Sequence, residues 1–208
     1  MKDWPENASV DMVDVVFELD AGTVAPDHAE ALAGALRRAL PWLDDEPLAG
    51  ILPLSGLGRG DGFSYVGRRS RLVIRMPIHR SASADSLSGS ALDLGGEPLG
   101  VGRSSLRPLL PITEVVHSYF VSFGTADEIE FLAACRAELA ARGIGGEPVT
   151  GRARRIKCAD GEVHGFALML HGLKRAESVA IQESGLGLHR LLGCGLFVPH
   201  KSIAAVGE

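Results

Sequence analysis

Residues 185–203 have the sequence G-L-G-L-H-R-L-L-G-C-G-L-F-V-P-H-K-S-I. Four glycines fall within eleven residues, as two pairs: Gly185 with Gly187, and Gly193 with Gly195. A basic step, His189 and Arg190, lies between the pairs. The apolar run 196–198 predicts a final strand, so this glycine-rich loop connects a helix to the last strand of the fold.

Glycine allows positive φ and lets backbone N–H groups approach an anion closely, so such a loop can cradle phosphates. It is not a nucleotide P-loop, because no Gly-Lys-Ser/Thr opens a helix. It is not a dinucleotide fingerprint either, since that motif follows a strand and opens a helix. The alternative is a flexible turn before a core strand.

Hydrophobic periodicity in the second half of the chain predicts the order β-α-β-β-α-β. The expected elements are a strand at 115–123, a helix at 126–142 capped by Gly143, a hairpin of 148–158 with 162–170, a helix at 176–183 and the final strand at 196–198. This half begins after a linker at 107–111.

The first half predicts the same order. Its expected elements are a strand at 12–19, a helix that starts at Pro26 and is ended by Pro41, strands at 51–54 and 71–76, a short helix at 81–87 and a hairpin over 91–101. Residues 56–62 are expected to form a flexible glycine-rich loop. The chain is therefore expected to contain an N-terminal domain, 1–102, and a C-terminal domain, 112–208.

Three motifs together resemble the CRISPR-associated pre-crRNA-processing endoribonucleases of the RAMP superfamily, in a compact branch. They are the spacing G-x-G-x-x-x-x-x-G-x-G before an apolar strand, the terminal P-H-K at 199–201, and the phrase P-D-H-A-E-A-L at 26–32. The resemblance covers Val13 to Ile203. It implies an α+β fold of two tandem ferredoxin-like units, with the glycine-rich loop before the last strand of the second unit.

The resemblance also implies an activity. Such proteins bind the stem-loop of CRISPR repeat RNA, cleave pre-crRNA without a metal through attack of the RNA 2′-hydroxyl, and stay on the guide within a multisubunit effector complex. The family's catalytic histidine lies on or near the first helix, and His28 is the residue at that place. Position 34 is Gly34 and no tyrosine precedes Tyr65, so the second catalytic group of some relatives has no counterpart.

Candidate RNA contacts come from the loop and from basic clusters. The loop supplies Gly185, Gly187, His189, Arg190, Gly193 and Gly195, followed by Lys201, and a predicted strand supplies Arg152, Arg154 and Arg155. Another cluster is Arg68, Arg69, Arg71 and Arg75. Solvated strand faces are the alternative for both clusters. Tyr119, Phe120 and Phe123 are expected in the core.

Composition sets limits on the function. The 208 residues carry a net charge of −5: residues 1–99 hold 9 basic and 15 acidic residues, and residues 100–208 hold 12 and 11. An RNA-binding surface must therefore be local. Three dispersed cysteines favour a reducing compartment, and no apolar run is long enough for a membrane span or a signal peptide, so we expect a cytoplasmic protein.

No metal site or cofactor is expected, because His117, His164, His171 and His200 lack ligand spacing. Two other functions stay open. One is a non-catalytic RNA-binding subunit of a CRISPR effector complex, and the other is a ferredoxin-like regulator that binds a small molecule.

Overall fold

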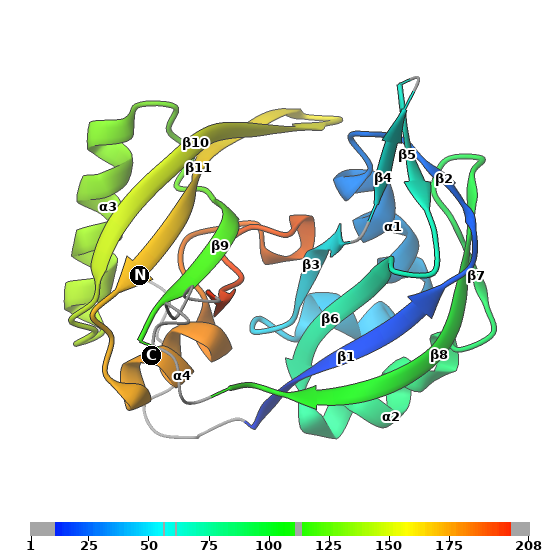
Figure 1. Cartoon of the computed structure of the whole chain (residues 1–208), viewed down its shortest axis with the longest axis horizontal. Coiled ribbons are helices and arrows are strands. Elements are labelled where there is room, and N and C mark those ends of the chain that lie inside the picture. The colour runs from blue at the N-terminus through cyan, green and yellow to red at the C-terminus, as the bar shows by residue number, and fades with distance from the viewer. Residues whose placement is uncertain (1–10, 56, 61, 111–113, 201–208) are drawn as a thin grey trace, which may run out of the picture.

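The computed structural model describes residues 11–55, 57–60, 62–110 and 114–200. Two antiparallel sheets lie side by side, with α1 and α2 against the first and α3 and α4 against the second (Figure 1). A third, small sheet flanks the first one. The elements of the two large sheets follow each other along the chain, so each half of the sequence builds its own sheet.

The first sheet has the strand order β3-β6-β1-β8-β7. Its elements are β1 (Met12–Leu19), α1 (Ala29–Ala39), β3 (Gly50–Ser55), β6 (Arg71–Pro77), α2 (Ser81–Ala84), β7 (Ala91–Asp93) and β8 (Pro98–Pro108). Without β7, which pairs only with β8, the order is second–third–first–fourth, as in a ferredoxin-like unit. Short 3-10 helices complete the unit: η1 (Pro41–Asp45), η2 (Ile78–Arg80) and η3 (Asp85–Leu87).

The second sheet repeats this order as β10-β11-β9-β12. Its elements are β9 (Val116–Val121), α3 (Glu128–Ala141), β10 (Glu147–Cys158), β11 (Gly161–His171), α4 (Arg175–Ser184), η4 (Arg190–Leu192) and β12 (Val198–Pro199). Asp127 caps α3 by accepting from the amides of Ile129 and Glu130, and Gly143 ends it with φ 65°. The predicted α+β fold of two tandem ferredoxin-like units is confirmed.

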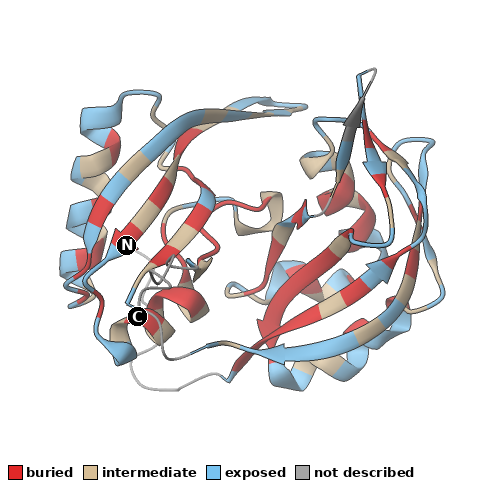
Figure 2. Cartoon of the chain, in the orientation of Figure 1, coloured by how far each residue is buried: buried red, intermediate tan, exposed pale blue. Residues whose placement is uncertain are grey.

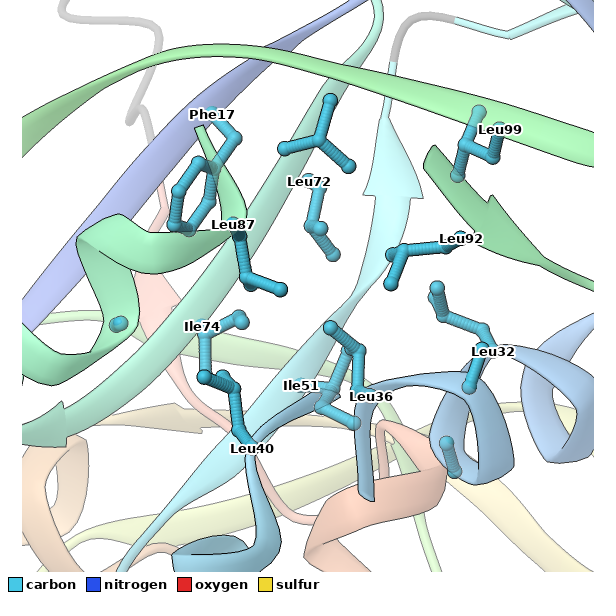
Figure 3. Close-up of a cluster of buried hydrophobic side chains, with 14 of the residues drawn as sticks. Phe17, Leu32, Leu36, Leu40, Ile51, Leu72, Ile74, Leu87, Leu92 and Leu99 are labelled. Atoms are coloured by element: carbon cyan, nitrogen blue, oxygen red, sulfur yellow. The ribbon is translucent and has the colours of Figure 1, made fainter. Parts of the chain in front are cut away.

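Each unit has its own apolar core. In the first, side chains of α1 such as Leu32 and Leu36 pack onto Phe17, Leu72 and Ile74 of the sheet (Figure 3). Figure 2 shows the same pattern as buried residues on the helix-covered faces of both sheets. Because each buried leucine contributes about 2 kcal/mol to stability, these cores hold each helix on its sheet.

The segment 56–62 differs from its prediction as a flexible loop. Within its described residues, β4 (Gly58–Gly60) pairs with β5 (Phe63–Val66), and β5 pairs with β2 (Gly22–Val24). These strands are three or four residues long and partly glycine, so they carry too little alternation for detection by periodicity.

Three boundaries also differ from prediction. Helix α1 begins at Ala29 with His28 as N-cap, so Pro26 precedes the helix. Strand β8 continues to Pro108, which places Arg107 and Pro108 in the sheet rather than in a linker. The division into domains 1–102 and 112–208, which this boundary does not test, stays a prediction. The third difference is at the end of the chain. The apolar run 196–198 contributes only Val198 to β12: Leu196 and Phe197 are buried before the strand starts, Phe197 in the core of the second unit.

Buried Arg75 joins the two units while it is ion-paired within the first. Arg75 of β6 donates from Nε to Oδ1 of Asp14 on β1 at 2.7 Å, and the two side chains are 1% and 4% exposed. The Nη1 of Arg75 donates to the carbonyl oxygens of Gln182 at 2.7 Å and Phe197 at 2.6 Å, both in the second unit. A buried charge is tolerated when it is paired and hydrogen-bonded, so this contact fixes the two units against each other. No helix of the described chain is long and apolar enough to cross a membrane.

Candidate functional site

A groove of about 980 Å³ lies between the two units. Its walls are the N-terminus of α1, strands β3 and β6 and the end of β8 from the first unit, and β9, β10 and the segment from η4 to β12 from the second. It contains His28 from the first unit and Arg154 and Arg155 from the second. The fold therefore brings the predicted catalytic residue and part of the predicted RNA-binding strand to one surface.

The groove is positively charged although the chain is acidic. Among the described residues that line it, five are arginines (Arg71, Arg75, Arg107, Arg154 and Arg155) and two are carboxylates (Asp14 and Asp27). Asp14 is already paired with Arg75 and, at 2.9 Å, with Arg107. Low-dielectric walls lined by one sign of charge concentrate the potential, so this surface attracts phosphates despite the net charge of −5.

His28 is oriented by a single hydrogen bond. Its Nδ1 lies 2.8 Å from the carbonyl oxygen of Ala25. Because a carbonyl oxygen only accepts, Nδ1 carries the proton and neutral His28 presents a lone pair at Nε2. The half-exposed ring lies at the N-cap of α1 without capping the helix itself. In the described chain Nε2 has no partner, so it can exchange a proton with a bound molecule.

Arg154 stacks on Tyr119 in the groove. Its Cζ lies 3.5 Å from the centroid of the Tyr119 ring, which is 48% exposed. The Nε of Arg154 is buried without a hydrogen-bond partner in the described structure, and no described carboxylate pairs with the guanidinium. Tyr119 was expected in the core; it faces the groove because it alternates along β9 with the buried Ser118 and Phe120.

Three glycines of the loop, Gly185, Gly193 and Gly195, are buried, and Gly187 is half-buried; Figure 2 shows the buried segment 193–197. Their amides donate to protein acceptors: Gly185 to Ile181 at 2.9 Å, Gly187 to Glu138 at 3.3 Å, Gly193 to Arg190 at 3.1 Å and Gly195 to Phe120 at 2.7 Å. A Cβ on Gly193 would lie 3.2 Å from the Ile51 carbonyl of β3. Gly193 thus serves close packing between the units, and the other three glycines serve close packing within the second unit. Their contact with RNA stays a prediction.

Arg190 extends across the end of α4 rather than out of the loop. Its guanidinium donates to the carbonyls of Ser184 at 2.6 Å and Glu183 at 3.1 Å in α4, and to Leu48 at 2.7 Å in the first unit. Burial, with the charges of Arg75 and Arg142, lowers the pKa of Arg190 to about 9, which leaves it protonated at neutral pH. Its donors are occupied inside the fold, so the geometry favours a structural role over phosphate contact.

Together three arginines bind the last carbonyls of α4. Arg75 binds the carbonyl of Gln182, Arg190 those of Glu183 and Ser184, and Arg142 that of Gly185 at 2.6 Å. The final carbonyls of a helix have no intrahelical partner and form the negative end of its dipole. The arginines bind these carbonyls and place positive charge at the negative end of the dipole. They thereby fix the point at which the glycine-rich loop starts. Arg75 was expected in a basic surface cluster; it is buried in this joint instead.

The remaining predicted contacts are distributed around the groove. Arg152 is exposed on β10, and Arg155 lies 3.3 Å from Glu162 across the hairpin. His189 is exposed with φ 64°, the one non-glycine residue of the described chain in the left-handed region. Lys201 lies outside the described residues.

His117 also lines the groove, from the same face of β9 as Tyr119. Burial and the nearby His200 lower its pKa, and the two rings meet edge to face at 5.4 Å. Within the described chain, no group of three or more His, Cys, Asp or Glu side chains has the arrangement of a metal site. Sequence reasoning missed Tyr119 and Arg107; the alternation of His117 and Tyr119 along one strand was the available signal.

Comparison with known proteins supports one family. The sequence pattern of the family described as Cas6 Crispr matches residues 13–202. The chain is 35% identical over 203 residues to the CRISPR-associated endonuclease Cas6 of Myxococcus xanthus (strain DK1622), covering 98% of this chain and 87% of that protein.

Solved structures share the fold at low sequence identity. A Cas6-related protein from Pyrococcus furiosus aligns with a TM-score of 0.67 at 12% identity, over 92% of this chain and 99% of that one. A RAMP protein described as binding different RNA substrates aligns with a TM-score of 0.64 at 11% identity, over 91% and 100%. The family match spans both ferredoxin-like units, and this chain belongs to the Cas6 family of CRISPR-associated proteins.

Proposed function

We propose that this protein is an endoribonuclease that binds the stem-loop of CRISPR repeat RNA and cuts pre-crRNA into guides. The observation that carries the proposal is His28: this residue lines an arginine-containing groove, and its Nε2 has no partner in the described chain. The endonuclease name of the 35% identical relative supports the same activity.

The reaction requires few protein groups, because RNA supplies its own nucleophile. The 2′-hydroxyl next to the scissile phosphate attacks in line, its proton leaves, and the 5′-oxygen of the next nucleotide is protonated as its bond to phosphorus breaks. The products are a 2′,3′-cyclic phosphate and a 5′-hydroxyl. We assign one of the two proton transfers to Nε2 of His28. Either the neutral ring accepts the proton of the 2′-hydroxyl or the protonated ring donates a proton to the leaving 5′-oxygen, and water serves the other oxygen.

The groove arginines supply the complementary charge. The guanidinium of Arg154 lies over the Tyr119 ring, so its far side and its terminal N–H groups remain for a base or a phosphate. Arg152 and Arg155 extend the positive charge along β10, and His189 adds an exposed donor on the loop. An A-form stem offers phosphates and 2′-hydroxyls more readily than base edges, so these contacts read mainly the shape of the hairpin.

Three further statements belong to the proposal. Cleavage needs no metal ion, because the nucleophile belongs to the RNA and histidine can move the proton at neutral pH. The protein stays on the product hairpin as a subunit of an effector complex. It acts in the cytoplasm.

The test is cleavage of a labelled repeat hairpin from the protein's own CRISPR locus, in EDTA. Two control RNAs are matched to it: a hairpin of scrambled sequence, and the repeat with a 2′-deoxy nucleotide before the scissile phosphate. We expect one cut with a cyclic phosphate end, lost in the deoxy RNA. Binding of the repeat without any cut would instead make the protein a structural RNA-binding subunit.

A further inference from the structure

The hairpin of β10 and β11 reaches across from the second unit to α1 (Figure 1). Strand β10 is the edge of its sheet, so every other amide near its end points away from β11. The amide of Lys157 donates to Oδ2 of Asp27 at 3.1 Å. The amide of Ala159 donates to both carboxylate oxygens of Glu30, at 3.0 and 2.9 Å. Two carboxylates of the first unit thus hold the hairpin tip of the second.

These carboxylates lie in an unfavourable place for an RNA-binding protein. Asp27 lines the groove, and like charges there weaken the attraction for phosphate. Neither carboxylate caps α1, whose N-cap is His28 without a side-chain bond. Burial and the charges of Glu30, Asp27 and Asp160 raise the pKa of the Cys158 thiol, which lies between the two held amides.

The held tip connects the two halves of the site. Asp27 directly precedes His28 in the chain. Lys157 follows Arg154 by three residues of strand, or about 10 Å of stiff extended backbone. The contact therefore joins the segment that carries His28 to the strand that carries Arg154.

We propose that Asp27 and Glu30 are positioning residues for cleavage. They hold the hairpin on α1, so that the phosphate bound by the arginines of β10 lies within reach of His28. This inference rests on the proposed function. A displacement of about 1 Å at a reacting centre can lower a rate by about 100-fold, so loss of the contact reduces the cleavage step more than binding.

The test compares paired variants. Asp27→Ala with Glu30→Ala removes the acceptors, whereas Asp27→Asn with Glu30→Gln removes the charges but keeps an acceptor oxygen at each position. Glu97→Ala, an exposed carboxylate in the turn between β7 and β8, is the matched control. Circular dichroism and thermal unfolding show that each variant is folded.

Three quantities are measured: hydrogen exchange of the Lys157 and Ala159 amides, Kd for the repeat hairpin, and the single-turnover cleavage rate. In the alanine pair we expect faster exchange at both amides, a rate at least about 10-fold lower, and binding as tight as in the parent or tighter. The Asn/Gln pair should retain most of the parent rate. The control should match the parent in all three.

Two results would overturn the inference. Faster exchange with an unchanged cleavage rate would mean that the contact exists but does not position the site. Unchanged exchange in the alanine pair would mean that the carboxylates do not hold the tip. Failure of the proposed function looks different: the parent itself leaves the hairpin uncut, and the exchange result then concerns a structural contact alone.

Discussion

Tyr119 and Arg154 form a stacked pair in which the guanidinium covers the aromatic ring. Such a surface suits unpaired nucleotides, because a guanidinium plane stacks on a base and its N–H groups bind phosphate. The Nε of Arg154 is buried beside the ring and has no hydrogen-bond partner in the described structure.

We expect Tyr119→Leu to weaken RNA binding by about 10-fold, because loss of the ring removes the cation–π contact, worth about 0.5–2 kcal/mol, that holds Arg154 in place for RNA. Fluorescence anisotropy with the labelled repeat measures the effect. Tyr65→Leu is the matched control: Tyr65 is 45% exposed on β5 and does not line the groove. Equal affinities of Tyr119→Leu and the parent would contradict a role of the stacked pair in RNA binding.

His189 sits in the left-handed region that favours glycine. His189→Gly should relieve about 1 kcal/mol of backbone strain and raise the melting temperature, yet weaken RNA binding by removing an exposed donor. His189→Ala keeps the strain and loses only the side chain. We therefore expect both variants to bind RNA equally weakly and to differ in stability. If both bind like the parent, His189 does not contact RNA.

At the scale of elements, the end of α4 organises the joint between the units. Arg190→Met keeps the apolar stem but leaves carbonyls of α4 and of the first unit without donors, at a cost of about 3 kcal/mol. Urea unfolding should show this loss. Arg175→Met, at the exposed first position of the same helix, should leave stability unchanged.

The same variant separates two roles of Arg190. If Arg190→Met unfolds at the parent's urea concentration but loses RNA affinity, the arginine contacts phosphate, as its place in the glycine-rich loop suggests. Lower stability with parent-like affinity, measured where the protein is folded, supports the clamp on α4.

Elements with a complete local signal could be predicted from the sequence. Strand β1 alternates apolar and polar residues, α3 starts at an Asp127 cap, and the hairpin turns at Ala159 and Asp160. The small sheet of β2, β5 and β4 could not, because each strand is short and gains its partners from distant segments.

The site divides in the same way. His28 could be proposed from its place on the first helix. The contacts that build the groove around His28 join residues far apart in the sequence. Arg75 binds the Phe197 carbonyl, 122 residues away, and Glu30 binds the Ala159 amide, 129 residues away. Nothing local marks an arginine as buried or a carboxylate as the partner of a distant amide, so the roles of Arg75, Arg190 and Glu30 required the folded chain.

At the scale of the whole molecule, positive charge is concentrated in the groove although the net charge of the chain is negative. Five arginines and two carboxylates are among the described residues that line the groove, whereas the chain as a whole carries 21 basic and 26 acidic residues. RNA binding should therefore weaken with salt as for a basic protein. We expect Arg154→Gln to lower the slope of log K against log salt by about 1.

The control for the salt slope is Arg136→Gln, an exposed arginine on α3 away from the groove. It should leave the slope unchanged, because its charge does not replace a counterion on the RNA. Equal slopes for Arg154→Gln and the parent would place the RNA on another surface.

The central claim is that His28 exchanges a proton in the cleavage of repeat RNA. Its most direct test is the single-turnover cleavage rate in EDTA of the parent, His28→Ala and His79→Ala, with Kd measured for each. His79 is an exposed histidine outside the groove. Since general acid–base catalysis contributes about 10²–10⁴-fold, we predict a rate at least about 100-fold lower in His28→Ala, with parent-like Kd, and no change in His79→Ala. A His28→Ala variant that cuts the repeat at the parent rate would contradict the account and move the catalytic site elsewhere.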